Sequence, residues 1–450
     1  MKKGDTVILN ITSMGDDGCG IAAGDEVYFI KGALEGEKVV AEIDYTDKKG
    51  RAFGRLKKVL QAAPGRRKPL CPLFGRCGGC ELQHMDYASQ LVFKKNSFER
   101  TMRKIGGISV DASVTPSPSE QGYRNKIQFP IREYGGRARC GFFEKNSHKL
   151  VPVEECPLHG EWGKLFISAV DEYLEKSGVA PYSEDGRGVL RNVIGRYVSD
   201  QLLFTAVVRR GKLPKPEILV SALEKRFDRF GLFVSLNEVD NNVILGEKTG
   251  HLYGIGRIEG ETCGVKILLR PESFFQVNDG IRSSLYSKAV ELAGNGAEMI
   301  VDAFSGTGVM TLMLAKRGAK TFGIELSASA IQDARENARL NKTENVSFIQ
   351  GDVVTELPRL LSSLRGRRVS VVCDPARKGI GEAALESIAV LRPERFVYVS
   401  CKASTQARDL AFFNRVSSGE YRVEYAGIFD QFPQTLSCES IVCMKRENKE

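Results

Sequence analysis

The chain has 450 residues, of which 42% are hydrophobic and 27% charged, values typical of a folded protein with room for two to four domains. No apolar run approaches the roughly 18–20 residues that a membrane-spanning helix needs. No export signal is recognised at the N-terminus, so we expect a cytoplasmic protein without a membrane partner. With a net charge of only +9, these values argue against a membrane, secreted or disordered protein.

Residues 1 to about 60 alternate polar and apolar side chains in short runs separated by glycines, at 6–11, 26–30, 37–43 and 52–59. Four or five short strands of this kind predict a small β-barrel. Nine basic residues and no acidic residue fall between Lys48 and Lys68. Such a run can hold the phosphates of a nucleic acid, or it can be a solvated basic linker.

Eleven cysteines without an export signal indicate a reducing compartment, where clustered thiols favour metal binding or catalysis over disulfides. Three of them form the pattern Cys71-x5-Cys77-x2-Cys80, and Cys156 precedes a proline. Cysteines alone do not decide the type of metal. A zinc module, with His84 or Cys156 as fourth ligand, is one interpretation of this cluster.

The middle of the chain mixes predicted helices and strands. The apolar periodicity predicts a helix over 84–106, which could pack on the C-terminal domain, and a second over 165–174. Strand-like runs lie at 127–131, 189–194, 202–208 and 243–246. We therefore expect a mixed α+β central domain.

The last third of the chain alternates strands with helices. Strands are predicted at 299–304, 321–325, 346–349, 369–373 and 396–400, and a closing hairpin at 421–428 and 440–445. This order predicts a doubly wound α/β domain, in which ligands bind beyond the carboxyl ends of the strands.

A glycine-containing turn, Ser305-Gly306-Thr307-Gly308, follows the first of these strands. Glu325 ends the second strand, 23 residues after Asp302, where a carboxylate can accept hydrogen bonds from ribose hydroxyls. Thr311 stands where a dinucleotide site would have its third glycine. The combination favours S-adenosyl-L-methionine, which has no pyrophosphate to bind, over a dinucleotide.

Two reactive side chains lie at later strand ends. Cys401 follows the fifth strand, where a thiol faces the ligand crevice and a nearby cation could lower its pKa. Glu439 precedes the last strand and could act as a base. For either residue alone, a buried thiol or a turn carboxylate would be the simpler interpretation.

Together these features resemble the RNA (uracil-5-)-methyltransferase family, and within it the 23S ribosomal RNA branch with an N-terminal TRAM domain and an iron–sulfur cluster. The motifs that carry the resemblance are, in chain order, Cys71-x5-Cys77-x2-Cys80, Tyr123-Arg-Asn-Lys126, Cys156-Pro157, Phe274-Phe-Gln-Val-Asn278, Asp302-Ala-Phe-Ser-Gly-Thr-Gly308, Asp374-Pro-Ala-Arg377, Ser400-Cys401 and Asp430-Gln-Phe-Pro-Gln-Thr435 followed by Glu439.

The resemblance implies a multidomain protein: an OB-like TRAM β-barrel over 1–60, a mixed α+β central domain with the iron–sulfur cluster over 61–270, and a Rossmann-like methyltransferase domain over 271–450. It implies methylation of uracil C5 in RNA, with Cys401 as the nucleophile and Glu439 as the base that removes the C5 proton. The residues that match cofactor contacts and cluster ligands are, for S-adenosyl-L-methionine, Gln276, Phe304, Glu325 and Asp374, and, for a [4Fe-4S] cluster, Cys71, Cys77, Cys80 and Cys156.

Ribosomal RNA is favoured as the partner because the tRNA branch, as a rule, lacks the N-terminal barrel and the cysteine cluster. A tRNA uracil-5-methyltransferase is the alternative. A radical S-adenosylmethionine enzyme would normally show Cys-x3-Cys-x2-Cys, and a noncatalytic RNA-binding protein would not need Cys401 and Glu439. DNA is not expected as a partner, since DNA cytosine methyltransferases use a Pro-Cys motif and no cysteine here follows proline. The chain departs from the family at Lys402, Ala403 and Ser437, which leaves the position of the substrate open.

Overall fold

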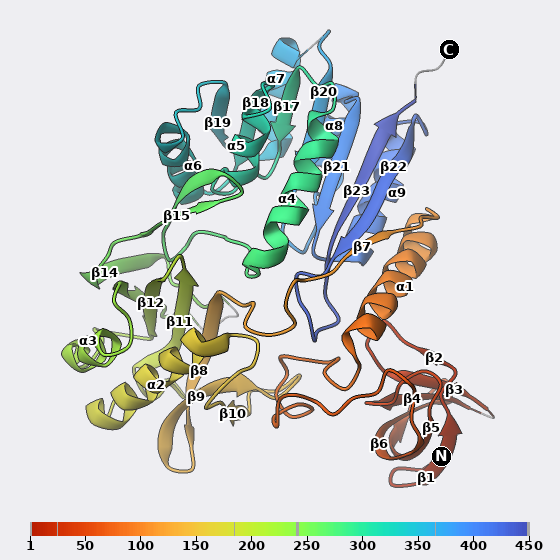
Figure 1. Cartoon of the computed structure of the whole chain (residues 1–450), viewed down its shortest axis with the longest axis vertical. Helices are drawn as coiled ribbons and strands as arrows, with labels where there is room; N and C mark the ends of the chain where they lie inside the picture. Colours follow the sequence, from red (N-terminus) through yellow and green to blue (C-terminus); the bar gives the residue numbers. More distant parts are fainter. Residues whose placement is uncertain (1, 25, 184, 240–242, 365, 448–450) are drawn as a thin grey trace. The chain divides into compact units, whose positions relative to one another are not determined.

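The computed structural model of the chain describes residues 2–24, 26–183, 185–239, 243–364 and 366–447 (Figure 1). Contacts divide the chain into two compact units, Met1–Ser97 with Phe432–Ser437, and Phe98–Gln431 with Cys438–Glu450. The division into domains 1–60, 61–270 and 271–450 stays a prediction. Within the described ranges, no helix has both the length and the apolarity needed to cross a membrane.

The first unit contains a six-stranded sheet with the strand order β1-β5-β6-β4-β3-β2. Its strands are β1 (Thr6–Asn10), β2 (Ser13–Met14), β3 (Gly20–Ala23), β4 (Val27–Lys31), β5 (Lys38–Thr46) and β6 (Arg51–Gln61). Alternate residues of β5, namely Val39, Ala41 and Ile43, are buried with Ile30 of β4. The sequence predicted β1, β4, β5 and β6 but not β2 and β3, which are too short to show a clear alternation. That this sheet is an OB-like TRAM barrel stays a prediction.

The basic run from Lys48 to Lys68 is not a linker, because β6 occupies most of it. Several of its cations pair with carboxylates of the same unit. The pairs are Arg51 with Asp47, Arg55 with Glu42 and Asp44, Lys57 with Glu42, and Arg66 with the buried Glu37. Part of the run therefore holds β6 to β5 and to the preceding turns rather than presenting unopposed charge.

The second unit begins within helix α1 (Tyr87–Gly106) and contains a seven-stranded sheet with the order β10-β9-β8-β11-β12-β13-β14. Helix α2 (Gly160–Ser177) packs on this sheet, where the Phe166 ring stacks on Phe204 at 5.0 Å and lies against Gly195. A Cβ at Gly195 would come within 2.5 Å of that ring, so the glycine admits the close approach. The remaining elements are β8 (Lys126–Tyr134), β9 (Arg137–Phe143), β10 (Leu150–Pro152), β11 (Leu190–Val198), β12 (Gln201–Val208), α3 (Pro216–Glu224), β13 (Phe230–Leu236) and β14 (Lys248–Gly254).

The strand predicted at 243–246 is wrong. Residues 243–246 form a loop before β14. The Asn237 side-chain amide donates to the carbonyl oxygens of Val243 (2.7 Å) and Ile244 (2.9 Å). Because these carbonyls accept a side-chain donor, they do not join a backbone ladder.

The last third of the second unit is the doubly wound domain that the sequence predicted. Its eight-stranded sheet has the order β19-β18-β17-β20-β21-β23-β22-β7, with β17 to β21 parallel and β23 antiparallel between β21 and β22. The strands are β7 (Ser113–Thr115), β17 (Met299–Asp302), β18 (Lys320–Glu325), β19 (Val346–Gln350), β20 (Val369–Cys373), β21 (Arg395–Ser400), β22 (Tyr421–Phe429) and β23 (Glu439–Arg446). The hairpin β15 (Ile258–Thr262) and β16 (Val265–Leu269) precedes them.

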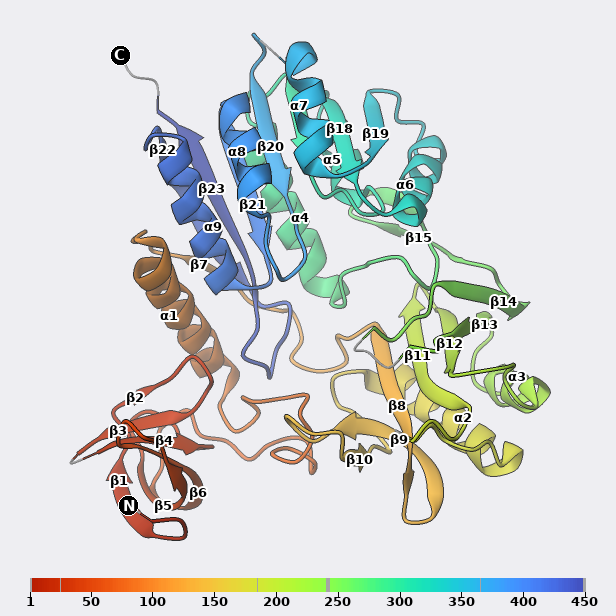
Figure 2. The same cartoon turned by 180° about the vertical axis from the view of Figure 1, so that it is seen from behind.

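Helices cover both faces of this sheet. Figure 1 shows α4 (Asp279–Gly294) in front of it, and Figure 2 shows α8 (Glu382–Leu391) and α9 (Ala403–Val416) in front of the opposite face. Neighbouring residues of a strand point to opposite faces of the sheet and pack in two different hydrophobic clusters. Val397 of β21 packs in the cluster that includes α4, and Phe396 packs in the cluster that includes α8 and α9. The other helices are α5 (Val309–Ala315), α6 (Ala328–Leu340) and α7 (Val353–Leu364).

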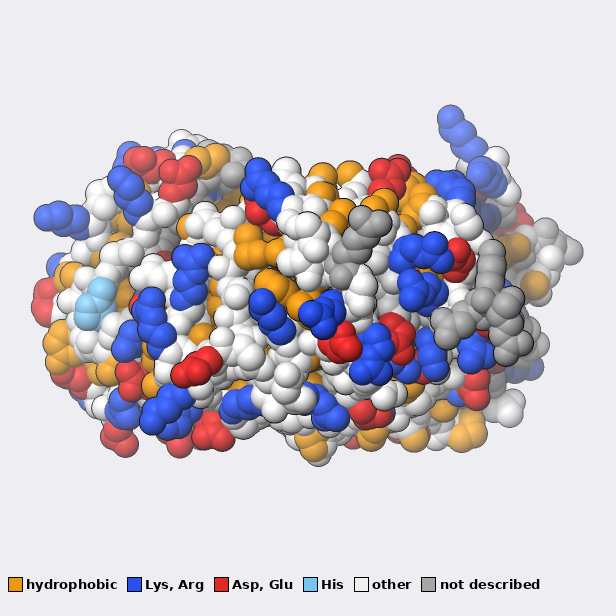
Figure 3. Space-filling model, turned by 90° about the horizontal axis from the view of Figure 1, so that it is seen from above, with side chains coloured by type: hydrophobic (Ala, Val, Ile, Leu, Met, Phe, Trp, Pro, Cys, Tyr) orange, Lys and Arg blue, Asp and Glu red, His pale blue; other side chains and the backbone are white. Residues whose placement is uncertain are grey.

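Charge on the face drawn in Figure 3 is mixed. Lysine and arginine side chains lie among aspartates and glutamates there. The chain has a net charge of +9, but the basic side chains on that face do not gather into a purely positive patch.

Candidate active site

Two glycines with positive φ angles shape the turn after β17. Gly308 has a φ of 83° at the start of α5, and a Cβ there would lie 2.7 Å from the Phe348 ring. Gly306, at a φ of 51°, donates its N–H to a carboxylate oxygen of Glu325 at 3.1 Å. Positive φ values are adopted readily by glycine, which explains both positions.

Glu325 ends β18 beside this turn and is partly exposed. One of its oxygens accepts the Gly306 N–H and the other accepts the Ser327 N–H at 2.7 Å. Each carboxylate oxygen keeps a second lone pair, so the fixed carboxylate can also accept hydroxyl donors. These two acceptor oxygens fit the ribose diol of S-adenosyl-L-methionine, whose hydroxyls donate.

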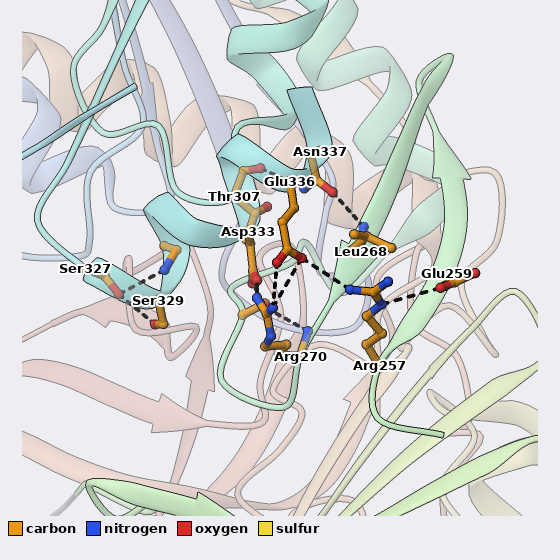
Figure 4. A network of polar contacts seen from close by, with 12 residues as sticks. Arg257, Glu259, Leu268, Arg270, Thr307, Ser327, Ser329, Asp333, Glu336 and Asn337 are labelled. Carbon is orange, nitrogen blue, oxygen red and sulfur yellow. Dashed lines mark hydrogen bonds and ion pairs between the residues drawn. The ribbon is translucent and has the colours of Figure 1, made fainter. Parts of the chain in front are cut away.

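A polar network anchors the segment that leads to Gln276 (Figure 4). Arg270 pairs with Asp333 and with Glu336 of α6, and Glu336 also pairs with Arg257. On the same helix, Asn337 accepts from the Leu268 N–H at 2.8 Å and donates to the Thr307 carbonyl at 3.0 Å. Helix α6 therefore fixes both β16 and the glycine turn.

Gln276 is buried at the end of that segment. Its side-chain oxygen accepts from Gln431 at 3.2 Å, and its backbone carbonyl accepts from Asn125 at 3.0 Å. Phe304 lies partly buried in the turn after β17. Gln276 thus contacts the segment that follows β22, Phe304 lies in the turn after β17, and Glu325 is the last residue of β18. That these residues contact S-adenosyl-L-methionine stays a prediction.

Cys401 and Glu439 are brought together by two neighbouring strands. Cys401 follows the last residue of β21, Glu439 is the first residue of β23, and the antiparallel register pairs Ser400 with Ser440. Glu439 is only 3% exposed, and its Oε2 atom has no hydrogen-bond partner among the described residues. A buried carboxyl oxygen without a partner costs free energy unless a ligand supplies one.

The thiol is not the low-pKa group that the sequence suggested. Burial and the Glu439 carboxyl raise the pKa of Cys401 above its ordinary value. Arg377, whose side chain hydrogen-bonds the thiol, lowers this pKa but is outweighed. The expected cation is therefore present, but the loss of solvent around the thiol has the larger effect and raises the pKa.

Three acidic side chains crowd the same strand ends. Burial and the neighbouring Asp302 carboxyl raise the pKa of Asp374 to about 7. Burial and Asp374 raise the pKa of Glu439 well above its ordinary value. A carboxyl with a pKa of about 7, such as Asp374, can exchange a proton with a substrate at physiological pH.

Arg377 is the residue that the sequence analysis quoted without giving it a role. It lies three residues after Asp374 and lowers the pKa of both Cys401 and Glu439. The Asp374-Pro-Ala-Arg377 motif could have indicated this role from the sequence, because an arginine shortly after a strand can reach groups at the end of that strand.

The predicted cluster ligands are divided between the units. Cys71, Cys77 and Cys80 lie in one loop of the first unit, and Cys156 belongs to the second unit. Burial raises the pKa of Cys77, and Cys71 is near enough to contribute. No three described His, Cys, Asp or Glu side chains are gathered as a metal site.

His84, the alternative zinc ligand, is buried in the first unit with its ring 5.4 Å from that of Phe74 in the cysteine loop. Neither of its ring nitrogens has a hydrogen-bond partner among the residues described. Burial lowers its pKa to about 4, so the ring is neutral at physiological pH.

Comparisons with known proteins find similar RNA methyltransferases. A family described as tRNA (Uracil-5-)-methyltransferase matches residues 264–447. The chain is 34% identical over 450 residues to an uncharacterized RNA methyltransferase of Listeria monocytogenes, covering 99% of this chain and 98% of that protein. It is 35% identical over 460 residues to one of Halalkalibacterium halodurans, covering 100% and 98%.

Among solved structures, the chain is similar to the tRNA (uracil-54, C5)-methyltransferase of Pyrococcus abyssi in complex with S-adenosyl-L-homocysteine. The TM-score is 0.78 at 27% identity, covering 97% of this chain and 99% of that one. Since this agreement extends over nearly the whole chain, the protein belongs to the RNA uracil-5-methyltransferase family and is an S-adenosylmethionine-dependent RNA methyltransferase.

Proposed function

We propose that this enzyme methylates C5 of a uracil in ribosomal RNA through a covalent bond between Cys401 and C6 of the base. The observation that carries the proposal is the placement of Cys401 and Glu439 at adjoining ends of β21 and β23. The buried Glu439 oxygen, which has no partner among described residues, supports a role toward a bound base.

The cofactor side of the reaction belongs to the loops around the glycine turn. S-adenosyl-L-methionine supplies an electrophilic methyl group on a cationic sulfur. Glu325 would accept hydrogen bonds from the ribose hydroxyls of the cofactor, Phe304 would offer an apolar face, and Gln276 and Asp374 would supply polar groups. A positive charge beside Asp374 would lower the raised pKa of that carboxyl and of Glu439, because it favours their ionised forms.

The nucleophile side uses the thiol. C5 of uracil is a poor nucleophile, and addition of the Cys401 sulfur to C6 places electron density on C5 as an enolate. The Arg377 side chain, which hydrogen-bonds the thiol, stabilises the thiolate that must form first. C5 then takes the methyl group as the bond between the methyl carbon and the sulfonium sulfur breaks, and the neutral thioether S-adenosyl-L-homocysteine leaves.

Release of the product needs a base. Glu439 removes the C5 proton, the C6–S bond breaks, and Cys401 leaves as a thiolate. Deeply buried and crowded by Asp374, Glu439 holds a proton more readily than an exposed carboxylate does. The target base must leave its stack to reach these groups, so the enzyme acts on a flipped or loop nucleotide.

A second candidate is methylation of uracil in tRNA. The structure from Pyrococcus abyssi, which is that of a tRNA methyltransferase, aligns with 97% of this chain and with 99% of its own length. The N-terminal strands and the cysteine loop therefore argue less strongly for ribosomal RNA than the sequence suggested. The resemblance of the whole set of sequence motifs to the 23S ribosomal RNA branch keeps ribosomal RNA as the first candidate.

Mapping 5-methyluridine in both RNA classes from a strain without this protein tests the assignment. We expect one or more sites in ribosomal RNA to lose the methyl group and to regain it with the wild-type gene but not with Cys401→Ala. Loss confined to tRNA would establish the second candidate. Unchanged 5-methyluridine in both classes would contradict both.

We also propose that Cys71, Cys77, Cys80 and Cys156 hold a [4Fe-4S] cluster. Thiolates are the usual ligands of such clusters, and three of the four lie within one ten-residue loop. The cluster would stabilise the fold and the RNA-binding surface rather than react, since the chemistry above needs no electron.

Iron, sulfide and zinc analysis of anaerobically purified protein tests this proposal. We expect about four irons per chain, with Cys80→Ser lowering the iron content and the thermal stability. Cys19→Ser, outside the motif, is the matched control and should retain iron. Zinc in place of iron would support the His84 alternative, and a requirement for a low-potential reductant would favour radical chemistry.

A further inference from the structure

A pocket of about 310 Å³ opens in the second unit beside the segment that carries Gln276. Three aromatic side chains line it: Tyr123, before β8; Trp162, from α2; and Tyr197, from β11. The rings of Trp162 and Tyr197 are stacked with centroids 5.5 Å apart and planes 10° from parallel. The catalytic Cys401 and Glu439 are not among its lining residues.

Hydrogen bonds set the geometry of these walls. The Trp162 indole donates to the Arg124 carbonyl at 3.0 Å, and the Tyr197 hydroxyl donates to Asp200 at 3.1 Å. The Arg124 guanidinium lies 6.0 Å from the centre of the Tyr123 ring. The pocket thus combines fixed aromatic planes with a cation, which is the combination that suits a nucleobase and its phosphate.

A buried polar group also faces this region. Asn125, which lines the pocket, is 4% exposed and donates through Nδ2 to the Gln276 carbonyl (3.0 Å) and to Asp279 (2.6 Å). Its Oδ1 atom has no hydrogen-bond partner among the described residues. This oxygen can accept an N–H from the edge of a base, and the same side chain holds the Gln276 segment.

We propose that this pocket is a subsite for an unpaired nucleobase of the RNA, distinct from the uracil that is methylated. The inference rests on the proposed function, because it assumes an RNA substrate. One base stacks on the aromatic wall and donates to Asn125, and the RNA strand then continues toward Cys401. Because Asn125 also donates to the Gln276 carbonyl, a base bound in the subsite would help to fix the position of Gln276.

Trp162 is the only tryptophan in the chain, so its intrinsic fluorescence reports on this pocket alone. The experiment titrates wild-type protein with a single-stranded oligoribonucleotide and measures fluorescence and filter binding together. We expect quenching that saturates with binding. Adenosine monophosphate and S-adenosyl-L-methionine, at the same concentrations, should leave the fluorescence unchanged, and equal quenching by the monophosphate would overturn the assignment to RNA.

Tyr197→Leu keeps an apolar side chain and removes the stacking plane. We expect about tenfold weaker RNA binding, the loss typical of one stacked base, with S-adenosyl-L-methionine affinity within twofold of wild type. Tyr253→Leu, on β14 and outside the pocket, is the matched control and should bind RNA normally.

RNA binding without any change in Trp162 fluorescence would overturn the subsite and leave the proposed function intact. So would a Tyr197→Leu variant that binds RNA as tightly as wild type. If the protein neither bound RNA nor transferred a methyl group to it, the subsite and the proposed function would both fail.

Discussion

Ser440 donates its hydroxyl to the carbonyl oxygen of Ser400 at 3.1 Å, and the two residues are also register partners in the antiparallel pair of β21 and β23. Both are buried. The residues next to them, Cys401 after Ser400 and Glu439 before Ser440, therefore lie at the same edge of the sheet. A sheet register, rather than a loop, sets the spacing of the proposed nucleophile and base.

Cys401→Ala should abolish methyl transfer, by at least about 10³-fold, because it removes the sulfur that is proposed to add to C6. Binding of S-adenosyl-L-methionine should stay within twofold of wild type, since the thiol acts on the base. The measurements are transfer of a labelled methyl group to RNA and calorimetric titration of the cofactor.

RNA with 5-fluorouracil at the target position gives a second test of Cys401. Fluorine cannot leave as a proton, so the wild-type enzyme should form an adduct that survives denaturation. Cys263→Ser, at a partly buried cysteine in the turn between β15 and β16, is the matched control and should still form it. An adduct formed equally by Cys401→Ala would assign the nucleophile elsewhere.

Glu439→Gln keeps the shape of the side chain and removes the base. Addition and methylation can still occur, but the C5 proton stays and Cys401 is not released. A methylated, denaturation-resistant complex of protein and RNA should therefore accumulate on gels, with turnover reduced by about 10²-fold or more. Normal product release would mean that another group removes the proton.

The sequence predicted the doubly wound domain well because its strands are short, apolar and regularly spaced. It placed Glu325 at the end of β18 and Cys401 at the end of β21, since both follow a clear strand. The end of a strand depends on the local order of apolar and polar residues, so it can be predicted from the sequence.

The sequence could not predict properties that depend on how segments meet. The raised pKa of Cys401 results from burial and from Glu439, which lies 38 residues further along the chain. The pairing of Arg55 with Glu42 follows from the register of β5 and β6, which alternation alone does not give. Tertiary contacts decide both.

Arg377→Met should make the Cys401 thiol less reactive. The guanidinium lowers the pKa of the thiol, so its removal raises that pKa further and reduces the thiolate fraction at pH 7. Alkylation of Cys401 by iodoacetamide, followed on its peptide by mass spectrometry, should slow about 3- to 10-fold, with its pH dependence shifted upward. Lys378→Met removes the next, exposed cation and should leave the rate unchanged. Equal rates in the two variants would contradict the role of Arg377.

Asp302 should make the protein less stable as the pH rises. It is fully buried at the end of β17, and burial raises its pKa from 3.8 to about 7, although the Thr311 hydroxyl donates to it at 2.7 Å. Between about pH 4 and pH 7 the folded state therefore binds more protons than the unfolded state, and the free energy of unfolding falls as the pH rises.

Asp302→Asn removes this proton uptake and keeps an acceptor for Thr311. We expect the variant to be more stable than wild type at pH 8, by of the order of 2–4 kcal/mol, and similar to it at pH 4. Asp374, whose pKa is also raised to about 7, should preserve part of the pH dependence. Urea unfolding from pH 4 to pH 8 measures the difference. Asp352→Asn, at an exposed turn, is the matched control and should follow wild type. Parallel stability curves for Asp302→Asn and wild type would show that this carboxyl does not titrate in that range.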